Sequence, residues 1–159
     1  MILGVISDTH GLLRPSVPEL LAGVDLIVHA GDVGTLAVLD ALREIAPTIA
    51  VRGNVDTAPW CTALPETEVV RVGEAGEAGQ IELYVLHDIA QLKFDPKRAG
   101  YRAVIYGHSH RASIEERDGV LYLNPGAAGP RRFNLSPSLA RVEVRGQELK
   151  VSLLTIAHP

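Results

Sequence analysis

The chain has 159 residues, of which 47% are hydrophobic and 21% are charged, a balance typical of a globular protein rather than a disordered one. Its formal net charge of -4 provides no basic bias, so we do not expect nucleic acid as a substrate or partner. This length suits one compact domain with its own core, and we predict a single domain over residues 1–159.

Cysteine usage and the N-terminus bear on the compartment. Cys61 is the only cysteine, so no disulfide can form within the chain, as is typical of reducing compartments. The N-terminus enters an apolar strand at once, without the basic segment or cleavage motif of a signal peptide, and no apolar run has the length of a membrane span. We therefore predict a cytoplasmic protein without a membrane partner, and a homo-oligomer is compatible with the sequence.

The first third of the chain alternates between strand and helix patterns. Apolar runs over residues 2–7, 25–30 and 48–51 predict buried strands. Between them, prolines and an acidic residue predict a short helix over 15–21, and an apolar stripe predicts a second helix over 35–44. This order predicts an α/β fold with parallel strands and right-handed crossovers.

The remainder of the chain has the pattern of hairpins. Residues 66–72 and 80–86 predict two strands, and the glycine-rich, acidic linker 73–79 between them predicts a mobile hairpin tip. A brief helix from Pro96 is expected before a strand over 103–105. Two further hairpins are predicted, one pairing 113–117 with 120–123 and the other pairing 139–145 with 148–155.

Side chains that bind divalent metals stand at the ends of several of these strands. In open α/β sheets, sites form just beyond the carboxyl ends of the strands, so we expect these side chains at one rim. If the chain stays extended at residues 108–110, both imidazoles of the His-Ser-His stretch face the same side. The seven candidate ligands are Asp8, His10, Asp32, Asn54, His87, His108 and His110.

The mixture of ligand types indicates the chemistry. Two carboxylates, four imidazoles and one amide oxygen suit manganese, iron, zinc or cobalt better than calcium. Seven ligands are too many for one catalytic ion with an open position, and about right for two. A shared carboxylate would hold two ions roughly 3.5–4 Å apart. With a bridging hydroxide, the centre would carry a charge of about +1, which favours a monoanion such as a phosphodiester.

The order and spacing of these motifs resemble the calcineurin-like metallophosphoesterases, in particular the small single-domain phosphodiesterases of bacteria and archaea. The matching motifs are Asp8-Thr9-His10, Gly31-Asp32, Gly53-Asn54-Val55-Asp56, His87, Gly107-His108-Ser109-His110, Asn124-Pro125-Gly126 and Pro130-Arg131. The resemblance implies a four-layer α-β-β-α sandwich.

The resemblance also implies how the ligands are shared. Asp32 would bridge two divalent ions, of which manganese is favoured, with iron, zinc, cobalt and nickel as alternatives. One ion would be held by Asp8, His10 and His110, and the other by Asn54, His87 and His108. The glycines before Asp32, Asn54 and His108 would let the backbone lie close to the ions.

Two positions depart from the family pattern. Larger members carry a histidine, taken to protonate the leaving group, where this chain has Val55. We therefore predict a phosphodiesterase in which a metal-bridging hydroxide attacks in line and which prefers good leaving groups. Asp88 stands where the family usually has glycine; it would either orient His87 or narrow the phosphate pocket.

The predicted catalytic residues are Asp32, Asn54 and His87, and the candidate substrate contacts are Asn54, Arg14 and Arg131. The substrate is expected to be a small phosphodiester, with loops 88–94 and 126–134 as pocket walls. The alternatives are a metal-binding scaffold, like the retromer subunit of this fold, and a nuclease or cyclic-nucleotide phosphodiesterase.

Three further residues are assigned structural roles. His29 should point away from Asp32. Asp56 should hold either Arg52 or the loop of Asn54, and Cys61 should contribute to packing because no base is placed to activate it.

Overall fold

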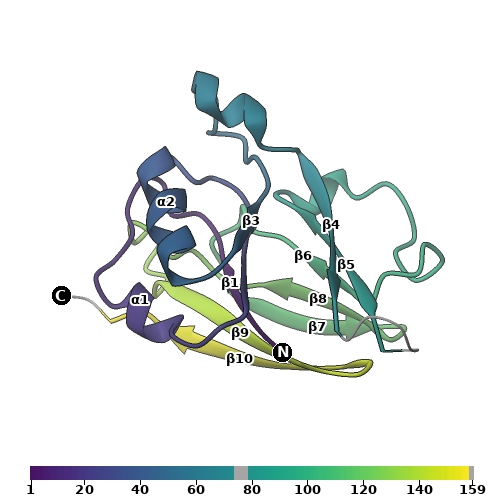
Figure 1. Cartoon of the computed structure of the whole chain (residues 1–159). Coiled ribbons are helices and arrows are strands. Elements are labelled where there is room, and N and C mark those ends of the chain that lie inside the picture. Colours follow the sequence, from purple (N-terminus) through teal and green to yellow (C-terminus); the bar gives the residue numbers. More distant parts are fainter. Residues whose placement is uncertain (74–78, 158–159) are drawn as a thin grey trace.

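Two five-stranded sheets make up the core of the fold, in a computed structural model that describes residues 1–73 and 79–157. In the first sheet, β1 (Ile2–Ile6), β2 (Leu26–His29) and β3 (Thr48–Ala50) run parallel, and the hairpin of β9 (Ser138–Arg145) and β10 (Glu148–Thr155) joins β1 antiparallel. The helices α1 (Val17–Leu20) and α2 (Leu36–Ile45) pack on the outer side of this sheet (Figure 1).

The second sheet contains the remaining strands, β4 (Thr67–Val72), β5 (Ile81–Leu86), β6 (Ala103–Ile105), β7 (Ser113–Arg117) and β8 (Val120–Asn124). Their order is β4-β5-β6-β8-β7, and β5, β6 and β8 run parallel. The predicted strands and the two predicted helices over 15–21 and 35–44 are confirmed, with bounds that agree within two residues. The predicted hairpin tip is described only at its two ends, because residues 74–78 lie outside the described residues.

The main core lies between the two sheets, as the predicted sandwich requires. It is built from the inward-facing residues of both sheets, such as Leu3 and Val5 of β1 and Leu83 and Val85 of β5, which are all at most 1% exposed. A second cluster fills the space between the first sheet and the helices, where Ile27 meets residues of α2. Because successive residues of a strand face opposite sides, β1 and β2 supply both layers.

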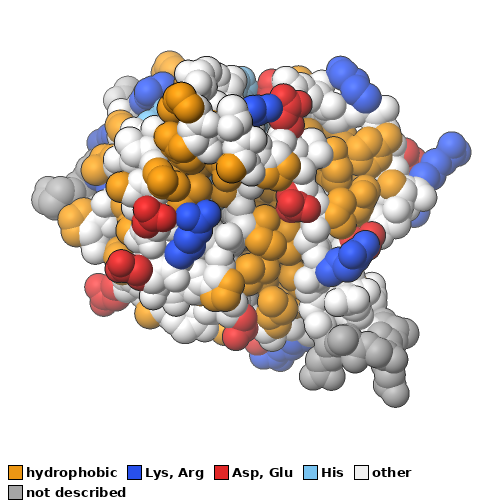
Figure 2. Space-filling model, turned by 45° about the horizontal axis from the view of Figure 1, so that its top comes forward, with side chains coloured by type: hydrophobic (Ala, Val, Ile, Leu, Met, Phe, Trp, Pro, Cys, Tyr) orange, Lys and Arg blue, Asp and Glu red, His pale blue; other side chains and the backbone are white. Residues whose placement is uncertain are grey.

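The outer face of the second sheet carries a third apolar cluster, with Leu86, Val104 and Val120 at its centre. The 3-10 helix η2 (Ile89–Gln91) and the segment after it form the covering layer on this side. Apolar side chains gather on the right of Figure 2, over this sheet, whereas histidine surface shows only in small areas near the upper edge. A further 3-10 helix, η1 (Pro59–Ala63), follows β3 and buries Cys61, in agreement with its predicted packing role.

The brief helix predicted from Pro96 is wrong, because residues 95–101 form a hydrogen-bonded turn. The carboxylate of Asp95 caps this turn by accepting a hydrogen bond from the N–H of Lys97 (3.0 Å). The N–H of Ala99 donates to the Asp95 carbonyl (3.1 Å), but the next N–H, of Gly100, donates to the Lys97 carbonyl (3.1 Å) instead of continuing the helix. The N–H of Tyr101 then donates to the Pro96 carbonyl (2.9 Å), and Gly100 has a φ of 88°, which a helix does not allow. Within the described residues, no helix is long and apolar enough to cross a membrane.

The placement of the core between the sheets predicts a difference between two leucines in strands. Leu83 is 1% exposed between the sheets, and Leu153, on β10, is 39% exposed. We expect Leu83→Ala to lower the free energy of unfolding by about 2–5 kcal/mol, because it leaves a cavity. Leu153→Ala should lower it by about 1 kcal/mol at most. Urea unfolding measures both values, and equal losses would contradict this placement of the core.

Candidate metal centre

The loop after β1 places Asp8 where the two sheets meet. Its Oδ2 accepts hydrogen bonds from the Ser7 hydroxyl (2.6 Å) and from the backbone N–H of His108, in the loop after β6 (3.1 Å). Its Oδ1 is buried and accepts no hydrogen bond from any residue that the structure describes. A buried carboxylate oxygen without a partner is destabilising, so this atom is well placed to bind a cation.

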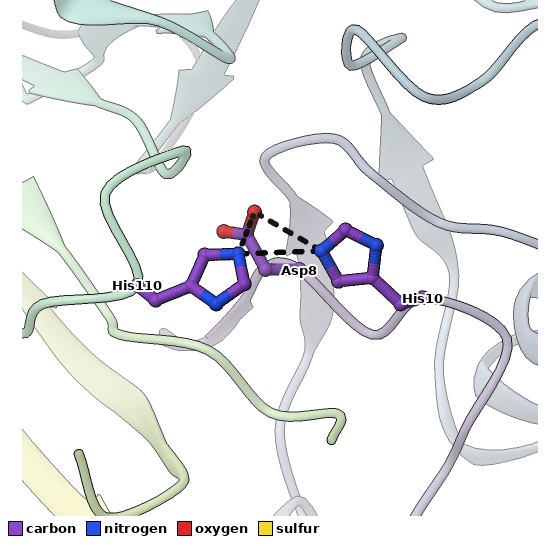
Figure 3. Close-up of side chains that lie close together, drawn as sticks. All are labelled: Asp8, His10 and His110. Atoms are coloured by element: carbon purple, nitrogen blue, oxygen red, sulfur yellow. Dashed lines mark hydrogen bonds and ion pairs between the residues drawn. The ribbon is translucent and has the colours of Figure 1, made fainter. Parts of the chain in front are cut away.

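His10 and His110 complete a first group of candidate ligands around Asp8 (Figure 3). The Nε2 atoms of the two histidines lie 3.3 Å apart. Asp8 Oδ1 lies 3.3 Å from His110 Nε2 and 3.8 Å from His10 Nε2. Around an ion with bonds of about 2.1 Å, neighbouring ligand atoms stand about 3.0–3.4 Å apart, so the three atoms are spaced much like the ligands of one ion.

A second group forms around Asn54, after β3, and His87, after β5. Asn54 Oδ1 lies 3.0 Å from His87 Nε2 and 3.1 Å from His108 Nδ1. The Nδ1–H group of His87 donates a hydrogen bond to the Ala30 carbonyl (2.8 Å). The lone pair of His87 is therefore on Nε2, the atom that faces the group and would bind an ion.

Asp32 lies between the two groups. Its Oδ1 accepts a hydrogen bond from the N–H of Val55 (3.0 Å), and its Oδ2 lies 3.2 Å from His87 Nε2 and 3.7 Å from His10 Nε2. Asp8 Oδ1 is also within 3.9 Å of His87 Nε2, so the two groups are adjacent. The structure brings together all seven predicted ligands, and a carboxylate oxygen between the groups fits a bridge between two ions.

Five of the seven candidate ligands have a left-handed backbone conformation. They are Asp8 (φ 54°), His10 (46°), Asp32 (55°), His108 (70°) and His110 (60°). The chain is therefore not extended at residues 108–110, because a tight turn forms there, closed by a hydrogen bond from Ser109 N–H to the Gly107 carbonyl (2.8 Å). A left-handed residue costs roughly 1–2 kcal/mol, and such strain is concentrated at functional sites.

Two glycines let the backbone pass close to the carboxylates. A Cβ on Gly53 would overlap the backbone nitrogen and the carboxylate of Asp32. A Cβ on Gly107 would overlap the Ser7 hydroxyl and approach Asp8 Oδ2 to 2.6 Å. The close approach expected at these glycines is therefore made to the carboxylate ligands and their hydrogen-bond donors.

Asp56 holds two ligand loops together. Its buried carboxylate accepts hydrogen bonds from the N–H groups of Val33 (3.1 Å), Gly34 (3.0 Å) and Gly53 (2.9 Å). These bonds join the loop of Asp32 to the loop of Asn54. Of the two predicted partners, Asp56 therefore holds the loop, while Arg52 forms an ion pair with Glu66.

His29 is completely buried and neutral. Its Nδ1 accepts a hydrogen bond from Gly31 N–H (3.1 Å), so its proton is on Nε2, which donates to the Thr9 hydroxyl (2.9 Å). That hydroxyl in turn donates to the Val33 carbonyl (2.9 Å). Burial lowers the pKa of His29 to about 4, against the opposing attraction of Asp56. His29 thus has the predicted structural role, connecting the loops after β1 and β2.

The ionisable candidate ligands influence one another. Burial is the largest single influence and by itself would raise the pKa of Asp32 and lower that of His87. The attraction between the Asp32 carboxylate and protonated His87, together with the hydrogen bonds from Val55 N–H and to the Ala30 carbonyl, outweighs burial. The pKa of Asp32 is therefore lowered and that of His87 is raised. Burial lowers the pKa of His110, with the Asp8 charge opposing it. The site thus keeps Asp32 charged, as binding of a cation requires.

The remaining predicted residues lie around this centre. Asp88 accepts a hydrogen bond from Ala90 N–H (3.0 Å), and its Oδ2 lies 3.9 Å from His108 Nε2, so the expectation that it orients His87 is wrong. Arg14 is 8% exposed and donates from Nε to the Gly129 carbonyl (3.0 Å). Substrate contact by Arg14 or Arg131 stays a prediction.

Asn124 is a residue whose role the sequence reasoning missed. Its Nδ2 donates to the Gly107 carbonyl (2.9 Å) and to the Ser109 hydroxyl (3.1 Å), and its Oδ1 accepts from Gly126 N–H (2.9 Å). It therefore holds the turn that carries His108. The signal was its place at the end of β8, where a buried asparagine needs several partners.

Comparison with known proteins identifies the family of this fold and site. Residues 1–147 match the calcineurin-like phosphoesterase superfamily domain, and the chain belongs to that family. The chain is 33% identical to a probable metallophosphoesterase of Methanocaldococcus jannaschii, over 98% of this chain and 82% of that protein. It is 30% identical to a phosphodiesterase of the same organism, over 79% of this chain and 83% of that protein.

Solved structures share the fold. An archaeal phosphodiesterase superposes with a TM-score of 0.72 at 24% identity, over 97% of this chain and 100% of that one. Vps29 of Entamoeba histolytica, in its zinc complex, superposes with a TM-score of 0.74 at 24% identity, over 98% of each chain. The fold implied by the resemblance is therefore confirmed.

The neutral state of His29 predicts a pH dependence of stability in the ion-free protein. His29 takes up a second ring proton near pH 6.5 in the unfolded chain but only at about pH 4 in the folded chain. The free energy of unfolding therefore falls as the pH falls from 6.5 to about 4. Complete titration would remove about 3 kcal/mol of unfolding free energy. Urea unfolding between pH 7.5 and pH 4 measures it. The control His29→Asn keeps an acceptor for Gly31 but does not titrate, and an equal pH slope in both proteins would contradict the assignment.

Proposed function

We propose that this chain is a phosphodiesterase that uses two divalent ions, manganese being favoured, in the two ligand groups. The observation that carries this proposal is that the two oxygens of each aspartate carboxylate have different partners. In Asp8 and Asp32, one oxygen is held by hydrogen-bond donors of the protein, and the other faces histidine nitrogens. Such oxygens are prepared for cations, and the donor set suits borderline divalent metals.

Family membership supports hydrolysis of a phosphate ester, and the charge of the site supports a diester. Two divalent ions, two carboxylates and one hydroxide sum to about +1, which matches a monoanionic diester. A relative among the phosphodiesterases agrees with this choice. Nucleic acid is disfavoured because the chain has a net charge of -4 and no basic bias.

The residues of the chain would position the substrate. When bound, the two ions would supply an activated hydroxide and positive charge beside the phosphate. Asn54 is exposed and turns its side-chain oxygen towards His87 and His108, so its NH₂ group is left to donate to a phosphate oxygen. Asp32 would fix the spacing of the groups, and His87 is held in orientation by the Ala30 carbonyl.

Val55 limits the chemistry of the leaving group. It is 45% exposed and lies next to Asn54, at the position where larger family members would supply a proton. Valine has no proton to donate, so this position cannot act as a general acid, a contribution typically worth 10²–10⁴-fold. The proposed substrates are therefore diesters whose leaving group departs without protonation from this side.

Metal binding tests the assignment of the two groups. Dialysed protein titrated with Mn²⁺ in a calorimeter should bind two ions, and His108→Ala and His110→Ala should each bind one fewer, because each removes a ligand of a different group. Leu153→Ala, on β10 and outside both ligand groups, serves as the control and should keep both ions. Retention of both ions by both alanine variants would overturn the assignment. A manganese-loaded protein that does not hydrolyse bis(4-nitrophenyl) phosphate would instead favour the metal-binding scaffold.

The leaving group provides a separate test of the role of Val55. Across aryl diesters that range from nitrophenol to phenol leaving groups, the rate should fall steeply as the pKa of the leaving group rises. Val55→His should flatten this slope and raise the rate on the phenyl ester by about 10²-fold, through general-acid catalysis. A flat slope in the unaltered protein would contradict the proposal.

A further inference from the structure

Phe133 is an exposed aromatic side chain without a structural explanation. It is 80% exposed, whereas the other exposed large apolar side chains that the structure describes are at most 45% exposed. It therefore contributes little to any core. Single exposed apolar side chains are common on protein surfaces, so exposure alone assigns no role to Phe133, and its backbone and its position are what distinguish it.

The backbone at Phe133 is also strained. Phe133 and Asn134 have φ values of 55° and 57°, and Leu135 N–H donates to the Arg132 carbonyl (3.0 Å) to close the turn. Two successive positive φ values are typical of type I′ turns, which favour asparagine or glycine at these positions. Asn134 fits this preference, but Phe133 does not. Bulky residues in this conformation are rare, and they occur mostly at ligand clamps and active sites.

The ring lies beside the candidate metal centre. The centroids of the Phe133 and His110 rings are 6.4 Å apart, and the rings are inclined at 68°. On its other side, His110 places Nε2 3.3 Å from Asp8 Oδ1, within the first ligand group. Arg131 and Arg132 precede the ring, and the guanidinium of Arg131 donates to the Asn134 carbonyl (3.4 Å). The loop thus holds an exposed ring at the rim of the first group.

We propose that Phe133 is a stacking surface for a nucleobase, so that the substrate is a phosphodiester of a single nucleoside. This inference rests on the proposed phosphodiesterase function. A nucleotide carries its base one sugar away from the phosphate, so a phosphate at the ligand groups brings the base to the rim where Phe133 stands. Every base has a flat face that stacks on an exposed aromatic ring. A single nucleotide also agrees with the net charge of -4, which does not suit a polyanion.

Two esters with the same leaving group test this proposal. They are the 4-nitrophenyl esters of thymidine 5′-phosphate and of methyl phosphate, which differ only in the substituent that stays on the phosphorus. In manganese-loaded protein, kcat/KM should favour the thymidine ester by about tenfold, the usual effect of one stacked base. Phe133→Ala should bring this ratio close to one, and Phe133→Tyr should retain it. An unchanged ratio in Phe133→Ala would overturn the proposal.

The chain offers a matched control in its only other phenylalanine. Phe94 ends the loop 88–94 that the sequence predicted as a pocket wall, but the structure packs its ring against Tyr84 and Tyr101 on the second sheet instead, with ring centroids 5.0 and 5.9 Å away. Phe94 is 41% exposed. Phe94→Ala should keep the ratio of the unaltered protein. Phe133→Gly tests a structural role, because glycine suits a positive φ, so Tm should stay the same or rise. A fall in Tm would assign Phe133 to the fold and overturn the stacking role.

Binding of a product separates this proposal from the proposed function. Calorimetry with thymidine 5′-monophosphate should show about tenfold weaker binding to manganese-loaded Phe133→Ala than to the unaltered protein, even if neither ester is hydrolysed. Hydrolysis of both esters at equal kcat/KM would support the proposed phosphodiesterase activity but overturn the proposed stacking role of Phe133. A dimer in sedimentation velocity that Phe133→Ala dissociates, with an unchanged ratio, would assign the ring to self-association and also overturn it.

Discussion

A hydrogen bond from His108 N–H to Asp8 Oδ2 (3.1 Å) joins the loop after β6 to the loop after β1, and so fixes how the two sheets meet. The His87 ring makes a similar link to the Ala30 carbonyl (2.8 Å). Both links are made by candidate ligands. The packing of the sheets and the geometry of the candidate metal centre therefore depend on each other, and a change at the interface between the sheets would displace the ligands.

The fold keeps these ligands in place at an energetic cost. Five of them have a left-handed backbone, at roughly 1–2 kcal/mol for each residue. Asp8 Oδ1 is buried without a hydrogen bond from any of the described residues, which adds to that cost. The compensation comes from hydrogen bonds between loops, such as those that the Asp56 carboxylate accepts from the N–H groups of Val33 and Gly53. Ions that bind only the folded state would stabilise it further.

The sequence predicted the strands and which candidate ligands would gather at one place, because both depend on local patterns. Apolar runs mark strands, and the carboxyl ends of parallel strands bring Asp8, Asp32 and Asn54 to one rim. It did not predict the left-handed backbone at His108 and His110, because that conformation depends on the turn at Gly107 and on contacts with the other sheet. Sequence periodicity does not predict the conformation of loops. For this reason the direction of the Asp88 side chain and the stacking role proposed for Phe133 could not be predicted either.

The proposed metal centre depends on Asp32, which would share one carboxylate oxygen between two ions. Electron paramagnetic resonance of the protein loaded with two equivalents of Mn²⁺ tests it directly, because a shared oxygen couples the two electron spins. We expect the spectrum of an exchange-coupled pair, which is replaced by that of isolated ions when one equivalent is added. The sum of two isolated Mn²⁺ spectra at two equivalents would contradict a shared Asp32 oxygen.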